Sequence, residues 1–77
     1  MLAITIKVQS KQIDIMVLPQ QRILEVLKVL RENGVFRIQQ IEDKSIYSMR
    51  YKEYINHNLT FQQANIFNGD ILEIREQ

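Results

Sequence analysis

Apolar side chains occupy every second position of two early stretches, Leu2 to Val8 and Ile13 to Val17. A period of two places the apolar side chains of each stretch on one face of a β-strand. The polar residues 9–12 between the stretches suit a short hairpin loop. The pattern therefore predicts an antiparallel pair of strands that ends before Pro19, which cannot donate to a ladder of strand hydrogen bonds.

The spacing of the apolar residues then changes to the period of an α-helix. The residues that share one helical face are Ile23, Val26, Leu27 and Leu30. Gly34 follows Asn33 at the position where a helix often ends in the left-handed conformation, and Val35 is placed to contact Leu30. We expect one amphipathic helix over about Gln21 to Asn33.

The second half of the chain predicts shorter elements. A strand is expected over Ser45 to Arg50, followed by a tight turn near residues 51–53 and a short return through Tyr54 and Ile55. Thr60 to Gln63 has the form of a capping box, which predicts one helical turn. Asn68-Gly69 predicts a turn before a last strand over Ile71 to Ile74.

The element order is β-β-α-β-β, with room for one extra short strand. One helix covers one face of a small sheet, which predicts a two-layer α+β fold in a single domain over residues 1–77. A right-handed crossover through the helix would place the last strand parallel to the first. This arrangement is the β-grasp plan.

Composition and charge exclude several classes of function. Ten basic and nine acidic residues give a net charge of +1, and the cations are spread along the chain, so we expect no nucleic-acid binding. The chain has no cysteine, which excludes disulfides and thiolate chemistry. The apolar stretches are too short for a signal or membrane segment, so a cytoplasmic protein without membrane insertion is expected. The alternative is a domain of a larger, membrane-bound parent.

Three segments carry a family resemblance. Lys11 to Pro19 reads K-x-I-x-I-x-V-x-P and resembles the first half of ubiquitin, and Thr60 to Ile66 resembles its closing segment. Ile66 to Ile74 fits the form I-x-[ND]-G-D-x-L-x-[IL], which is similar to the ending of the YukD/EsaB family. These are small ubiquitin-like proteins encoded with type VII secretion systems of Gram-positive bacteria.

The resemblance implies a ubiquitin-like protein that serves the secretion system as an accessory or regulatory component, with a protein of the machinery as its partner. In the simplest register, Ser48 takes an inward site that is usually aliphatic in such proteins, and Met49 points outward. The alternative is a one-residue difference in the preceding loop, which would reverse the two faces of the strand.

The chain end bears on conjugation. Ubiquitin and sulfur carriers act through a C-terminal Gly-Gly, whose lack of side chains lets the tail enter an activating enzyme. The sequence contains only Gly34 and Gly69, and it closes with Arg75-Glu76-Gln77. We therefore expect a non-conjugating protein, as the resemblance also implies. The alternatives are a carrier with an activated C-terminus and a ubiquitin-like module of a larger secretion-membrane protein.

No residue pattern predicts catalysis, a metal site or a cofactor. His57, the single histidine, lies between two asparagines and is expected to be a solvated loop residue. A metal site needs several converging ligands, which His57 and the adjacent pair Glu42-Asp43 do not supply. The serines have no nearby base that would activate them. We expect no enzymatic activity.

The outer face of the sheet is the expected protein-binding surface, because ubiquitin-like domains often use it and because Met, Tyr and Arg favour interfaces. The residues expected there are Tyr47, Met49, Glu73 and Arg75. The plainer alternative is an ordinary surface. Met16 and Leu18 are expected to form a further apolar patch or a self-pairing edge, and the latter would make the protein a homo-oligomer.

Overall fold

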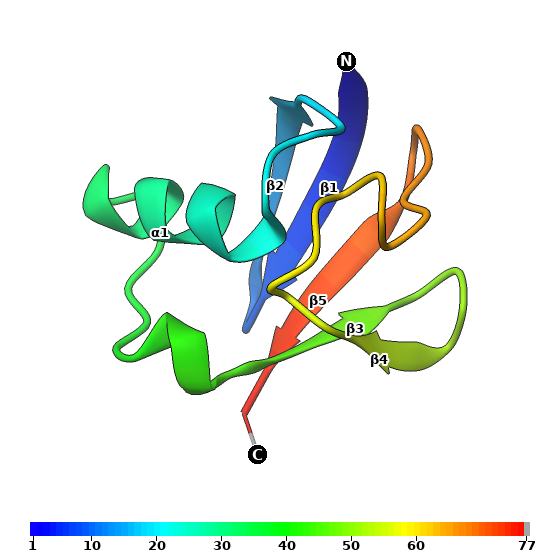
Figure 1. Ribbon diagram of the computed structural model, residues 1–77. Coiled ribbons are helices and arrows are strands. Elements are labelled where there is room, and N and C mark those ends of the chain that lie inside the picture. Colours follow the sequence, from blue (N-terminus) through cyan, green and yellow to red (C-terminus); the bar gives the residue numbers. More distant parts are fainter. Residues whose placement is uncertain (77) are drawn as a thin grey trace.

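Five strands form one mixed sheet in the order β2-β1-β5-β3-β4, and α1 crosses one face of it (Figure 1). The computed structural model describes residues 1–76. Its elements are β1 (Leu2–Val8), β2 (Lys11–Val17), α1 (Ile23–Glu32), the 3-10 helix η1 (Ile41–Asp43), β3 (Ser45–Ser48), β4 (Glu53–Ile55) and β5 (Ile71–Arg75). The extra short strand that the sequence allowed is β4.

The strand pairing confirms the predicted topology. β1 and β2 form an antiparallel hairpin with Leu2 opposite Val17, and β5 lies parallel to β1 with Thr5 opposite Ile71. β3 then pairs antiparallel with both β5 and β4. The α+β β-grasp arrangement expected from the sequence pattern is therefore the observed fold.

The alternation of β1 directs its apolar side chains toward the helix, where Ile4 and Ile6 are almost fully buried. The helix contributes Ile23 and Leu27 to the same layer. The remaining core side chains are Val8, Val17, Phe36, Ile38, Ile41, Ile46, Phe61, Ile66, Leu72 and Ile74. Each large apolar side chain buried in this way contributes about 1.5–3 kcal/mol, so this layer supplies the main driving force for folding.

The helix starts at Ile23, two residues after the predicted start, because a distant loop caps it. The N–H of Ile23 donates to the Leu59 carbonyl at 3.0 Å, and the N–H of Leu24 donates to the His57 carbonyl at 2.9 Å. These bonds satisfy backbone donors that a helix leaves unpaired in its first turn. The segment that carries these carbonyls, yellow in Figure 1, thus passes the N-terminal end of the helix.

The C-terminal end of α1 has the predicted geometry. Gly34 adopts a φ of +74° and donates its N–H to the Arg31 carbonyl at 3.0 Å. The N–H of Val35 donates to the Leu30 carbonyl, also at 3.0 Å. This pair of bonds is the Schellman motif, which satisfies carbonyls at the end of a helix.

β3 ends at Ser48, two residues before the predicted end at Arg50, because the turn begins earlier than expected. The turn covers residues 49–52 and is closed by a bond from the Lys52 N–H to the Ser48 carbonyl at 2.8 Å. Ser48 is completely buried, and its Oγ accepts the N–H of Tyr51 at 3.1 Å. The simplest register is therefore correct, because the turn gives the inward hydroxyl a partner.

The capping box at Thr60 is present as predicted. The N–H of Thr60 donates to Gln63 Oε1, and the N–H of Gln63 donates to Thr60 Oγ1, both at 3.0 Å. The segment forms turns without continuing as a helix. It places Phe61 in the core, fully buried.

Candidate functional site

Tyr47 lies on β3, on the face of the sheet opposite α1. In the sheet register it stands beside Glu73 of β5 on one side and Tyr54 of β4 on the other. Its neighbours in β3, Ile46 and Ser48, point into the core, so the alternation of the strand directs Tyr47 outward. The sheet thereby brings together three side chains from three strands.

Arg75 completes this group. Its guanidinium carbon lies 3.7 Å from the centroid of the Tyr47 ring, and its Nε donates to Glu73 Oε1 at 2.5 Å. The two tyrosine rings meet edge to face, with centroids 5.2 Å apart at 73°. We call Tyr47, Tyr54, Glu73 and Arg75 the aromatic–arginine cluster. Edge-to-face rings and a cation over a ring are both favourable, so the side chains hold one another in place.

Arg75 contributes the positive charge of the cluster, and it is ion-paired with Glu73. Hydrogen bonding to Tyr54, and then to Glu73, raises the pKa of the Arg75 guanidinium above its ordinary value. Desolvation of the guanidinium acts in the opposite direction with a smaller effect. Because both hydrogen-bond partners favour the charged form, Arg75 stays cationic throughout the physiological pH range.

Met49 lies just beyond the cluster, two residues after Tyr47 and past the end of β3. Its N–H donates to the Ile71 carbonyl at 3.1 Å, which extends the pairing of β3 with β5 by one bond. The residue is 39% exposed. A shallow hollow of about 290 Å³ is lined by Met49, Arg50, Gly69, Asp70 and Ile71. The structure thus joins Tyr47, Glu73 and Arg75 directly and places Met49 at the edge of the same region.

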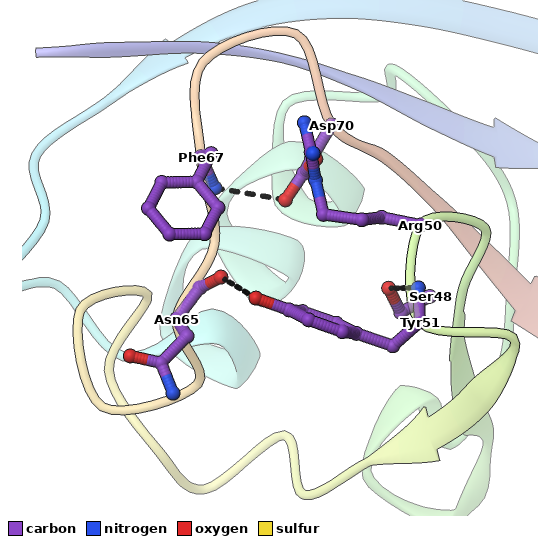
Figure 2. A network of polar contacts seen from close by, with 6 residues as sticks. All are labelled: Ser48, Arg50, Tyr51, Asn65, Phe67 and Asp70. Atoms are coloured by element: carbon purple, nitrogen blue, oxygen red, sulfur yellow. Dashed lines mark hydrogen bonds and ion pairs between the residues drawn. The ribbon is translucent and has the colours of Figure 1, made fainter.

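Asp70, which lines this hollow, belongs to a network of polar contacts (Figure 2). Its carboxylate is buried, with only 1% of the side chain exposed. One oxygen, Oδ2, accepts the N–H of Phe67 at 2.8 Å, and the other forms an ion pair with Arg50 Nε. The Arg50 guanidinium also lies over the Phe67 ring, 5.4 Å from its centroid. Through these contacts Asp70 stabilises the turn that precedes β5.

Tyr51 provides a second link between the same two segments. Its hydroxyl donates to the Asn65 carbonyl at 2.6 Å, as Figure 2 shows. Together with the ion pair of Arg50 and Asp70, this bond attaches the 49–52 turn to the 65–70 loop. Met49 therefore projects from a turn that is held at two points.

Tyr54 and Arg50 were missing from the residues expected at the site. Tyr54 pairs with Tyr47 only because the hairpin turn covers residues 49–52. The sequence pattern predicts that turn near residues 51–53, a position that does not set the two tyrosines opposite each other. A turn centred between Arg50 and Tyr51 would have revealed it, since the two tyrosines are equally distant from that point.

The other candidate residues do not converge. His57 is half-buried in its loop and uses its backbone carbonyl to cap the helix. Within residues 1–76, no group of three or more His, Asp or Glu side chains is arranged to hold a metal ion. In the same part of the chain, no helix has the length and apolar character needed to cross a membrane.

Solved structures share this fold. A de novo designed protein based on ubiquitin superimposes with a TM-score of 0.73 at 21% identity, over 96% of this chain and 85% of the design. The crystal structure of ATBAG1 in complex with HSP70 gives a TM-score of 0.74 at 16% identity, over 100% of this chain and 41% of the matched chain. The protein therefore has a ubiquitin-like β-grasp fold. At these identities the likeness establishes the fold alone.

The sequence itself has no match among protein-family models, and a search of the curated proteins also finds none. The function must therefore be inferred from the surface of the fold and from the sequence motifs.

Proposed function

We propose that this protein is a non-conjugating, ubiquitin-like binding protein that docks on a protein partner through the outer face of its sheet. It would act without catalysis, in the cytoplasm, as an accessory or regulatory component of a type VII secretion system. The observation that supports the docking role most strongly is the aromatic–arginine cluster, with Met49 at its edge.

The composition of this face suits an interface. Tyrosine and arginine are enriched among the residues that dominate binding energy, and methionine adapts to varied partners. The cluster is also pre-ordered, because Arg75 is stacked on Tyr47 and bonded to Glu73 before any partner arrives. Pre-ordering lowers the entropy that docking costs, so a small surface can bind usefully.

The assignment to secretion rests on the resemblance of the segment Ile66 to Ile74 to the ending of the YukD/EsaB family. In the structure this ending ties the last strand to the first: the Ala3 N–H donates to Asn68 Oδ1, and the Gly69 N–H donates to the Ala3 carbonyl, both at 2.7 Å. These contacts give the motif a structural role. The secretion role is therefore tested by the identity of the partner.

Co-purification from the native host tests the proposal. We expect the unmodified protein to capture a component of the secretion machinery and the double variant Tyr47→Asp/Met49→Asp to lose it. Two added carboxylates would be desolvated in the docking interface, which costs several kcal/mol, and Tyr47→Asp also removes the ring on which Arg75 stacks. Because both positions lie outside the core, the variant should retain its circular dichroism spectrum and its cooperative unfolding.

Gln39→Asp/Gln62→Asp is the matched control, because it adds the same charge at two exposed loop positions. It should capture the partner as the unmodified protein does. Equal capture by both variants would exclude the outer face. Capture of proteins unrelated to secretion, lost in the Tyr47→Asp/Met49→Asp variant, would still support docking through the outer face. It would overturn the assignment to the secretion system.

Intact mass spectrometry of the native protein separates docking from conjugation. A non-covalent binding protein should show the unmodified mass of its chain. A processed Gly-Gly terminus or a covalent adduct would instead favour a carrier with an activated carboxylate.

A further inference from the structure

The two edges of the sheet differ in how well they are protected. β4 has only three residues and includes the charged Glu53, and short, charged edge strands resist pairing. β2 has seven residues paired one to one with β1, with neither a bulge nor a proline within it. The charge at its middle, Asp14, is bonded to the Thr5 hydroxyl at 2.6 Å. β2 therefore presents an open row of backbone donors and acceptors.

The inner side of β2 is also incompletely covered. Ile13 and Ile15 point toward the helix but remain only half-buried, whereas Ile4 and Ile6 of the neighbouring strand are fully buried. A groove of about 530 Å³ separates β2 from α1. Its lining is mainly apolar: Ile15, Met16, Val17, Val26, Val29 and Leu30, with Gln21 and Glu25. Met16 and Val29 are 58% and 53% exposed, so both rims of the groove are apolar.

We infer that β2 pairs antiparallel with β2 of a second copy of this chain, around a two-fold axis at Ile15. A two-fold axis normal to the sheet always pairs odd-numbered residues with odd-numbered residues and even with even, so that side chains on one face meet side chains on the same face. On the inner side, the half-buried Ile13 and Ile15 and the buried Val17 of one copy therefore lie opposite inner-face residues of the other copy. The edge of β2 is therefore complementary to a second copy of itself. An unrelated peptide would be complementary to it only if its apolar residues had the same spacing.

Charge repulsion and apolar contact together favour one register of the strand pair. An axis at Asp14 would place two carboxylates directly opposite each other, which destabilises a strand pair. An axis at Ile13 would set Val17 against the partner's Gln9. With the axis at Ile15, Ile13 meets the partner's Val17 and Asp14 meets the partner's Met16. This register covers the half-buried Ile13 and Ile15 with apolar side chains of the partner and avoids the repulsion.

The size of the contact sets its strength. Only one strand and the rims of one groove take part, which is at the low end of the area that specific interfaces bury. We therefore expect a reversible dimer, with a dissociation constant on the order of micromolar.

Such a dimer would present two docking faces on one side. β3 and β4 lie at the far end of the sheet from β2, so dimerisation leaves the aromatic–arginine clusters free. The two-fold axis puts both clusters on the same face of a continuous ten-stranded sheet. This consequence rests on the proposed docking function, and it would raise avidity for a partner with two binding sites. The dimer itself does not depend on that function.

Sedimentation equilibrium from about 1 µM to about 1 mM tests the dimer without a partner. The mass should rise from the monomer value of 9.2 kDa toward twice that value. Met16→Glu should weaken dimerisation about tenfold, because symmetry places two such carboxylates opposite Asp14. Met16→Lys is the matched control at the same exposed position, and it should dimerise at least as well as the unmodified chain.

Amide hydrogen exchange supplies an independent readout, since protection of the outward amides of β2 should increase with concentration. A chain that stays at 9.2 kDa at the highest concentration would overturn the inference. A dimer that neither Met16 variant changes, or that both weaken equally, would also overturn it. The same holds if β2 gains protection only when another protein is added.

Discussion

Asp70 shows how one side chain can determine the shape of a surface. A carboxylate is rarely buried unless it is paired, and this one has both the Phe67 N–H and the Arg50 guanidinium as partners. Through them it joins the turn that carries Met49 to the turn that starts β5. The position of Met49 on the outer face is therefore set by a residue that does not itself reach the surface.

Removing that carboxylate should cost stability. We expect Asp70→Ala to lower the free energy of unfolding by about 2–4 kcal/mol, because it leaves the Phe67 N–H and the Arg50 guanidinium without their partner. Urea denaturation measures the change. Asp70→Asn, which retains an acceptor for the Phe67 N–H, should cost less. A loss under about 1 kcal/mol for the alanine variant would contradict the assigned role.

At the scale of elements, the accuracy of prediction depended on where the hydrogen bonds come from. β1 has the bounds that its alternation predicts, because the apolar residues that face the core alternate with outward-facing residues along the strand itself. The helical pattern predicts a start of α1 two residues before the observed one, because the first N–H groups of the helix bond to carbonyls of the 57–59 loop. Hydrogen bonds between segments so far apart in the sequence produce no local residue pattern, so this helix start could not be predicted.

The hairpin of β3 and β4 gives the same lesson for the site. A two-residue error in the end of β3 concealed the pairing of Tyr47 with Tyr54, and hence the aromatic partner of Arg75. Tyr47, Glu73 and Arg75 could be placed together from strand alternation alone. The stacking of their side chains could not, because it depends on the exact register between three strands.

The end of α1 offers a quantitative test at this scale. Gly34 has a φ of +74°, and a Cβ added there would meet nothing within 4 Å. The cost of a substitution should therefore come from backbone strain alone. We expect Gly34→Ala to destabilise the fold by about 1 kcal/mol, and Gly34→Asn to cost less, because asparagine tolerates the left-handed region. Equal stability of all three proteins in thermal unfolding would contradict this reading.

At the scale of the molecule, one helix covers one face of the sheet and leaves the other face for binding. The layer order followed from the sequence because the first two strands each have a single apolar face, and the parallel placement of β5 beside β1 followed from the crossover. The fold leaves two surfaces without a cover: the outer face around Tyr47 and the free edge at β2. The first supports the proposed docking role, and the second supports self-association.

The most direct test is a nitrogen-15 NMR titration of the labelled protein with the purified partner from the co-purification. We expect amide shifts to change along β3, β4 and β5, with the largest changes near Tyr47, Tyr54 and Arg75, and signals from α1 to stay in place. Changes confined to α1, or spread evenly over the molecule, would contradict docking through the outer face.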